Sequence, residues 1–274
     1  MTGALERPQG TLSCVMRAGV LCLVGVVATT RPARAQDNYE IQVYGAELVP
    51  RGATMLELHS NYTFRDSGDT TSGVLSTRHA VHETIEITHG FTDWLEVGVY
   101  VFTSAAARVG WQWVGDHVRP RLSVPERWHW PVGVSLSQEI GYQRRAYSAD
   151  TWTWEIRPIV DRRFGRAYIS LNPVLDRSLR GPGAGEGFSF SPNALVSLDL
   201  TPRVTVALEY YAAFGPLSDF APLDRSEQQL FPAVDLDFGP DWEFNAGVGV
   251  GLTPTTDRLL AKVILGRRFG GHHS

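Results

Sequence analysis

The feature that most constrains this chain is a strict alternation of apolar and polar residues. In residues 54–64, apolar side chains occupy positions 56, 58, 62 and 64, and polar side chains occupy positions 57, 59, 61 and 63. Successive side chains of a β-strand point to opposite faces, so this period of two predicts a strand with one apolar and one polar face.

The same alternation recurs along the rest of the chain. It is present in 81–89, 94–103, 117–124, 132–143, 151–161, 167–175, 190–200, 203–211, 230–238, 242–250 and 259–269. Together these segments predict an all-β fold of about twelve strands. No segment approaches the roughly 18 consecutive apolar residues that a transmembrane helix needs.

The connections between these strands differ systematically in length. The odd-numbered ones are mostly long and polar: 65–78, 104–116, 144–150, 177–188 and 212–228, with the short 252–257 as an exception. The even-numbered ones are mostly short: 90–93, 125–131, 162–165, 201–203 and 239–241. Alternating long and short hairpins are typical of a transmembrane antiparallel up-and-down β-barrel of the bacterial outer membrane.

A soluble sandwich or barrel is the alternative, since it would also bury one face of each strand. Three features favour the membrane barrel. Charged residues recur on one face of nearly every strand, the tryptophans cluster near strand ends, and the last strand stops at the aromatic Phe269, close to the C-terminus. Barrels in the outer membrane carry aromatic girdles at both interfaces.

The N-terminus resembles a secretory signal peptide. Arg7 and Arg17 precede an apolar run at 18–28, and Ala33-Arg34-Ala35 supplies the small-residue cleavage pattern. We therefore expect a signal peptide (1–35), a periplasmic lead or partial plug (36–52), an outer-membrane β-barrel (53–269) and a short tail (270–274). Residues 36–52 are equally compatible with a cap, an insert in the lumen or a flexible lead.

Composition excludes some classes of function. The formal net charge of −4 does not fit a nucleic-acid-binding protein, which would be basic. The glycine-rich stretch 181–187 lacks the strand-to-helix context and the Gly-Lys-Ser/Thr sequence of a phosphate-binding loop. His272 and His273 lie on a terminal tail and do not form a metal site. We assign no catalytic residue, no metal site and no cofactor.

One stretch resembles a known family. Residues 89–99 read His-Gly-Phe-Thr-Asp-Trp-Leu-Glu-Val-Gly-Val. They are similar to the first periplasmic hairpin of a bacterial family named for the meta-cleavage pathway of phenol degradation, as are 47–52 and 133–143 more loosely. The resemblance implies a porin-like or transporter-like outer-membrane barrel that passes hydrophobic or aromatic compounds. Its motifs are structural and imply no catalytic residue.

The polar face of the strands supplies the candidate lumen-lining residues. They are Glu57, His59, Glu86, Glu96, Arg119, Arg121, Glu139, Glu155, Arg157, Glu209, Asp235, Asp237 and Lys262. Such residues either form a salt-bridge network that fills the lumen or line a channel whose charges set its selectivity. If Glu57 faces Thr88, then His59 faces Glu86, and a lone His–carboxylate pair of this kind is usually structural.

Three functions follow in order of preference. The first is an outer-membrane, porin-like barrel through which small molecules pass. The second is a plugged barrel with a structural or binding role. The third is a lipid-modifying enzyme, which is disfavoured because the adjacent His59 and Ser60 point to opposite faces of a strand. The expected partners are the outer-membrane lipid bilayer, a small-molecule solute and the barrel assembly machinery.

Overall fold

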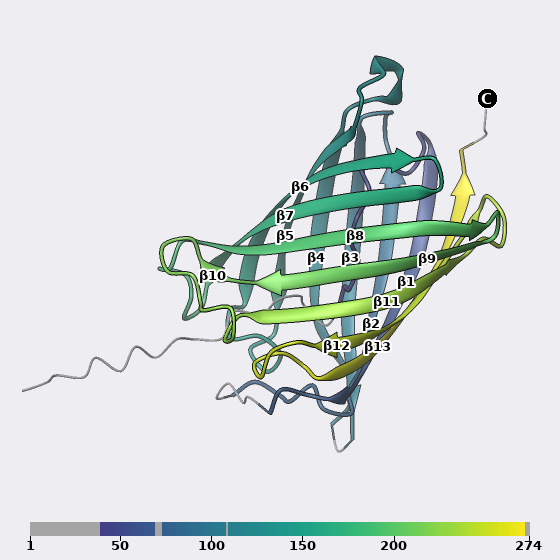
Figure 1. The fold of residues 1–274 in the computed structure, drawn as a ribbon. Coiled ribbons are helices and arrows are strands. Elements are labelled where there is room, and N and C mark those ends of the chain that lie inside the picture. The colour runs from purple at the N-terminus through teal and green to yellow at the C-terminus, as the bar shows by residue number, and fades with distance from the viewer. Residues whose placement is uncertain (1–38, 69–72, 108, 272–274) are drawn as a thin grey trace, which may run out of the picture. The chain divides into compact units, whose positions relative to one another are not determined.

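The computed structural model describes residues 39–68, 73–107 and 109–271. These residues form one antiparallel sheet in which strands adjacent in sequence pair with each other. The sheet closes into a barrel because β1 pairs with β13 (Figure 1). The prediction of an all-β barrel of about twelve strands is confirmed.

The twelve barrel strands are 10 to 14 residues long, which suffices for a tilted strand to cross a bilayer. They are β1 (Ala53–Arg65), β2 (Val81–Gly90), β3 (Leu95–Ala106), β4 (Gly110–Ser123), β5 (Gly133–Gln143), β6 (Trp152–Phe164), β7 (Ala167–Arg180), β8 (Phe188–Thr201), β9 (Val204–Ala213), β11 (Glu227–Leu236), β12 (Trp242–Gly251) and β13 (Leu259–Gly270). The two-residue β10 (Gly215–Pro216) pairs only with the start of β8, and a short 3₁₀ helix, η1 (Glu126–Trp128), lies between β4 and β5.

The connections gather at the two ends of the barrel. We call the end at which β1 begins and β13 ends the turn end, since it carries tight turns such as 165–166 and 202–203. The opposite end carries the connections 66–80, 144–151 and 214–226, and we call it the loop end.

The predicted long loop at 104–116 is wrong. Strand β3 continues to Ala106 and β4 begins at Gly110, so only three residues connect them. Phe102 pairs with Gly115 and Thr103 pairs with Trp113, which leaves Val114 as the extra residue of a β-bulge. A bulge shifts the phase of the alternation, so the sequence pattern is interrupted at a point where the strand continues.

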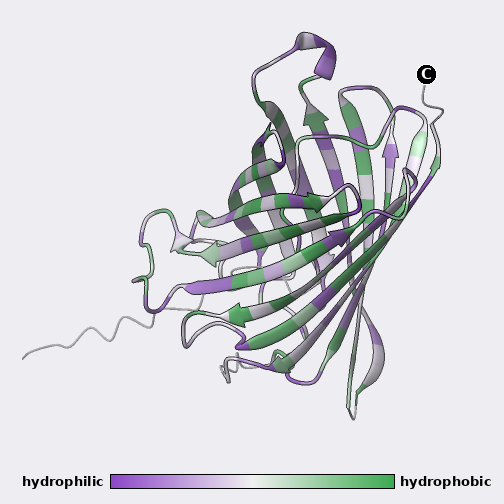
Figure 2. Cartoon of the chain, turned by 45° about the vertical axis from the view of Figure 1, so that its right-hand side comes forward, coloured by the Kyte–Doolittle hydropathy of each residue, from purple (hydrophilic) through white to green (hydrophobic). Residues whose placement is uncertain are grey.

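The outer face of the barrel is apolar. Leu58, Ile87 and Leu208 on three different strands expose 41%, 49% and 47% of their surface. Figure 2 shows hydrophobic and hydrophilic residues alternating along the strands of the barrel. A belt of exposed aliphatic side chains on a closed barrel is what a lipid environment requires.

Exposed tryptophans lie near both ends of the barrel. Trp94, Trp128 and Trp242 lie at the turn end, and Trp111 and Trp152 lie at the loop end. Their amphipathic rings suit the two interfaces between hydrocarbon and water, so their positions fit an aromatic girdle at each end of the barrel.

Two sequence predictions fall outside the described residues, namely the signal peptide (1–35) and the tail histidines His272 and His273. Within the described ranges, no helix combines the length and the apolar character needed to cross a membrane.

Candidate functional site

The interior of the barrel contains residues 39–50, which we call the insert. Tyr39, Ile41, Val43 and Tyr44 are all at least nine-tenths buried. The insert has no regular secondary structure of its own, and it is hydrogen-bonded to side chains of β2, β4, β7 and β13. A segment of this kind acquires its conformation from the wall that surrounds it.

The insert begins near the loop end. Thr84 of β2 donates a hydrogen bond to the Tyr39 carbonyl over 2.5 Å. The Tyr39 ring packs edge-on against His82 at 4.8 Å between centroids and against Phe102 at 5.5 Å. Tyr147, from the connection between β5 and β6, joins the same apolar cluster.

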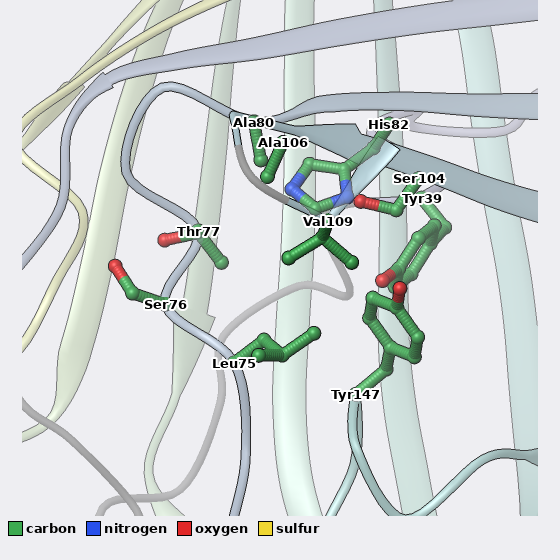
Figure 3. A pocket seen from close by; sticks show the side chains of 10 residues that line it. All are labelled: Tyr39, Leu75, Ser76, Thr77, Ala80, His82, Ser104, Ala106, Val109 and Tyr147. Carbon is green, nitrogen blue, oxygen red and sulfur yellow. The ribbon is translucent and has the colours of Figure 1, made fainter. Parts of the chain in front are cut away.

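A small cavity of about 20 Å³ adjoins this cluster (Figure 3). Its lining includes Leu75, Val109 and Tyr147 from the loop-end connections together with Tyr39 and His82. A cavity of this size has room for about one water molecule. The loop end of the insert is therefore closely packed.

The middle of the insert is held through its backbone. The Tyr44 amide donates to Asn172 Oδ1 at 2.9 Å, and the Tyr44 carbonyl accepts hydrogen bonds from Asn172 Nδ2 at 2.9 Å and Ser170 Oγ at 2.6 Å. Because the side chains of the wall bind main-chain atoms of the insert here, they fix the position of the insert.

The Tyr44 ring lies among arginines. The guanidinium carbons of Arg119, Arg157 and Arg121 lie 4.4, 5.0 and 5.4 Å from its centroid. Cation–π contacts of this kind gain strength when they are shielded from water. Arg121 also donates to the carbonyls of Gly45 at 3.1 Å and Glu47 at 2.7 Å.

A second contact region lies on the opposite strands. Lys262 of β13 donates to the Ile41 carbonyl at 3.0 Å and forms an ion pair with Glu209 of β9 at 2.6 Å. Ile41 packs in an apolar cluster that includes Tyr211 and Phe231. The chain has one lysine, and it is used to hold the insert.

Charged side chains of the wall bind the part of the insert at the turn end. The Val49 amide donates to Glu96 Oε2 at 2.7 Å, and Glu96 Oε1 lies 2.8 Å from Arg121 and 3.6 Å from Arg119. Arg119 also binds Glu86 at 2.6 Å. These four charged side chains of β2, β3 and β4 form one buried network against the insert.

The structure places most of the predicted lumen residues inside the barrel. Ten of the thirteen are at most 8% exposed: Glu57, His59, Glu86, Glu96, Arg119, Arg121, Glu139, Arg157, Glu209 and Lys262. Glu155 and Asp235 are half-buried; Glu155 binds Arg157 at 2.6 Å, and Asp235 accepts a hydrogen bond from Asn245 at 2.7 Å. Asp237 follows the end of β11 and is exposed in the turn to β12.

The observed register between β1 and β2 differs by two residues from the pairing of Glu57 with Thr88 considered above. Glu57 faces Glu86 across the strands. His59 nevertheless lies near Glu86, with 3.4 Å between Nε2 and Oε2, because it is the diagonal neighbour on the same face. A shift of two residues leaves every side chain on its own face, so alternation alone cannot detect it.

Several interior residues were missed. Glu40, Tyr44 and Asn172 belong to the insert and its clamp, and the sequence carries no local signal for a contact between segments so far apart. His117 and its partner Glu139 are also buried. Here a signal existed, because His117 has the same phase in β4 as Arg119 and Arg121.

A large cavity lies at the turn end. It measures about 1130 Å³, and its lining includes Glu57, Glu86, Arg119 and Arg121 from the wall and residues 44–50 of the insert. Asp237 and Arg203 from the turns also border it. The charged network is therefore in contact with a space large enough for a small solute.

The arrangement expected of an outer-membrane lipid enzyme is not formed by His59 and Ser60. His59 is fully buried in the interior, whereas Ser60 lies on the opposite face and donates to Glu83 at 2.6 Å. The two side chains cannot act on one substrate.

Comparison with solved structures identifies the class of fold. An outer membrane channel from Pseudomonas putida F1 aligns with a TM-score of 0.56 and 12% identity over 84% of this chain and 100% of the channel. A NanC porin aligns with a TM-score of 0.51 and 10% identity over 79% of this chain and 100% of the porin. The chain has the fold of outer-membrane, porin-like barrels.

Sequence comparison does not identify a particular family. No family model matches the chain, and no curated protein matches it. The resemblance to the phenol-degradation family stays a prediction.

Proposed function

We propose that this protein is an outer-membrane barrel through which small polar or charged molecules pass, and that residues 39–50 act as its plug. One observation carries the proposal: the barrel has an apolar exterior and a charged interior, and the interior side chains hold the insert through its backbone. The signal peptide, cleavage after Ala35 and insertion by the barrel assembly machinery belong to the same proposal.

The chemistry of the lumen bears on the solute. The turn-end cavity is lined by Glu57, Glu86, Glu96, Arg119 and Arg121. Charges of both signs suit hydrated, polar or zwitterionic solutes, which replace water contacts with contacts to the wall. The interior provides no support for a preference for hydrophobic or aromatic compounds.

A permanently plugged barrel with a structural or binding role is the second candidate. It is favoured by the complete burial of the central side chains, such as Tyr100, Tyr211 and Lys262, around the insert. The two candidates differ in whether the insert leaves the lumen. They therefore predict different effects of removing it.

The test compares two chains in planar bilayers, Gln36–Ser274 and Arg51–Ser274. If the insert is a displaceable plug, the longer chain gives brief openings and the shorter chain gives larger, sustained conductance steps. A shorter chain that folds, as judged by heat-modifiable gel migration, but carries no current would contradict passage through the lumen. Should the shorter chain not fold, Asn172→Ala in the full chain tests the same point, as described in the Discussion.

A further inference from the structure

We propose that Glu57, His59 and Glu86 form a binding site for a divalent transition-metal ion of the zinc type in the wall of the lumen. The proposal goes beyond passage of solutes and does not depend on it, because a closed barrel would bind the ion equally well. It also departs from the sequence analysis, which assigned no metal site.

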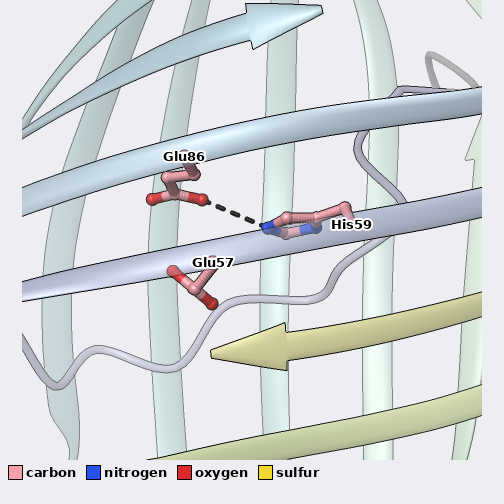
Figure 4. A group of neighbouring side chains, drawn as sticks. All are labelled: Glu57, His59 and Glu86. Carbon is pink, nitrogen blue, oxygen red and sulfur yellow. Dashed lines mark ion pairs between the residues drawn. The ribbon is translucent and has the colours of Figure 1, made fainter. Parts of the chain in front are cut away.

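The first observation is the placement of the three side chains (Figure 4). Glu57 of β1 and Glu86 of β2 are direct cross-strand partners, and His59 follows Glu57 on the same face. One potential ligand atom from each residue lies within 4.8 Å of the others. Like charges directly opposite each other destabilise a strand pair unless something compensates them.

The second observation is that the site contains unsatisfied, fully buried polar atoms. His59 is 0% exposed, and its Nδ1 has no hydrogen-bond partner. Its Nε2 and Glu86 Oε2 contact each other only through a long ion pair of 3.4 Å, and neither atom has a further partner. Buried polar atoms are normally satisfied, so such a group of atoms points to a missing ligand.

The local charge balance supports a cation. Around Glu57 lie the carboxylates of Glu40, Glu86, Glu96 and Glu243. Arg119 and Arg121 form ion pairs with three of them, and the guanidinium of Arg157 also acts on Glu40, so five carboxylates face three guanidinium groups. Glu243 joins the set because it and Glu57 both flank Gly266 of β13. A divalent cation would offset part of the excess negative charge.

The donor set indicates the class of metal. One imidazole nitrogen and two carboxylate oxygens are ligands of Zn²⁺ and similar ions, whereas Mg²⁺ and Ca²⁺ prefer oxygen alone. A metal at about 2.1 Å from each atom brings the ligands to roughly 3.5 Å apart. His59 Nε2 and Glu86 Oε2 already have this separation, so only Glu57 has to move closer. The remaining oxygen of Glu86 accepts hydrogen bonds from Thr88 and Arg119, which orient the carboxylate.

The ion has a route to the site. Glu57 and Glu86 border the turn-end cavity of about 1130 Å³. Coordination positions that the protein leaves open would face this cavity and would be filled by water or by an anionic group of a solute. A metal ion bound at this site could therefore contact a solute that enters the turn-end cavity.

The test is a titration of chain Gln36–Ser274, refolded in detergent and stripped with a chelator. Zn²⁺ binding is measured by isothermal titration calorimetry, and Co²⁺ serves as a spectroscopic probe of the nitrogen ligand. We expect one strongly bound Zn²⁺ for each barrel. His59→Gln and Glu57→Gln should each weaken binding by about tenfold or more and change the visible spectrum of bound Co²⁺.

The matched control is His117→Gln. His117 is another buried lumen histidine beside a carboxylate, but within the described chain only Glu57, His59 and Glu86 bring three potential ligands together. This variant should bind Zn²⁺ like the parent. Equal binding by the parent and His59→Gln would overturn the proposal, as would a parent that folds with heat-modifiable migration and binds no Zn²⁺. His272 and His273 are present in every variant and cannot account for a difference.

Discussion

Asn172 brackets the backbone of Tyr44, because its side chain accepts from the Tyr44 amide and donates to the Tyr44 carbonyl, each over 2.9 Å. One side-chain amide thus makes the same pair of hydrogen bonds to Tyr44 that the backbone of a neighbouring β-strand would make. Asn172 lies on β7, more than one hundred residues along the chain from Tyr44. This clamp fixes the backbone of the insert to the barrel wall through both polar groups of one residue.

Removing the clamp should release the insert. In Asn172→Ala two hydrogen bonds are lost, which together contribute about 1–3 kcal/mol to docking. We expect the frequency of channel openings in planar bilayers to rise roughly tenfold, since about 1.4 kcal/mol corresponds to that factor. Asn245→Ala is the control, because Asn245 is also buried in the interior but bonds to Asp235. The prediction is wrong if both variants open equally often.

Arg121 should affect both docking and ion selectivity. Arg121→Gln removes the donors to the Gly45 and Glu47 carbonyls and leaves Glu96 with less compensation. We expect more frequent openings and a shift of the reversal potential, measured in a salt gradient, towards cation selectivity. Arg127→Gln is a control, because Arg127 is exposed on η1, pairs with Asp93 and does not line the turn-end cavity. An unchanged reversal potential for Arg121→Gln would show that permeating ions do not pass this residue.

The buried pair of Lys262 and Glu209 should contribute strongly to stability. Both side chains are at most 2% exposed, and removing one partner of such a pair typically costs about 3–5 kcal/mol. Lys262→Met should lower the urea midpoint of unfolding in detergent. Adding Glu209→Gln should recover much of the loss, because the uncompensated carboxylate is removed. A double variant no more stable than Lys262→Met would contradict this reading.

The apolar outer face predicts that the loss of stability caused by a charged substitution depends on the depth of the residue in the bilayer. Leu58→Arg places a charge near the middle of β1 on the outer face, and this should reduce folding stability in lipid vesicles by about 2–4 kcal/mol. Trp242→Arg, at the turn end, should cost no more than about 1 kcal/mol from the charge itself. Equal effects at the two positions would indicate that the outer face does not meet hydrocarbon.

The sequence predicts the fold well because the barrel repeats one simple rule. Each strand needs apolar side chains outside and polar side chains inside, and alternation reports this directly, as in β1 and β13. Prediction from alternation is wrong where a strand departs locally from this rule. The bulge at Val114 places two buried residues in succession, and a continuous strand was therefore interpreted as a loop.

The interior was predicted less completely, for two physical reasons. Alternation fixes the face of a side chain but leaves the register open by two residues, so the pairing of Glu57 with Glu86 was missed. The alternation in the insert covers only residues 39–43, which is too short to indicate a strand, and the position of the insert depends on distant partners such as Asn172 and Lys262. His117 had the right phase in β4 and could have been included.

The central claim is that the insert controls passage through the lumen, and it can be tested within one molecule. Both cysteines, Cys14 and Cys22, precede Gln36, so chain Gln36–Ser274 is a cysteine-free background. Gln42 of the insert contacts Glu243 of β12, with 3.4 Å between Nε2 and Oε1. Gln42→Cys and Glu243→Cys can therefore be joined by a short bifunctional methanethiosulfonate reagent and released by reductant.

The measurement is single-channel conductance of this double variant before bridging, after bridging and after reduction. We predict openings before bridging, silence while the insert is tethered to the wall, and renewed openings after reduction. Each single-cysteine variant, treated in the same way, should keep its openings. Conductance that persists unchanged while the bridge is intact would contradict the claim that residues 39–50 must leave their place for the barrel to open.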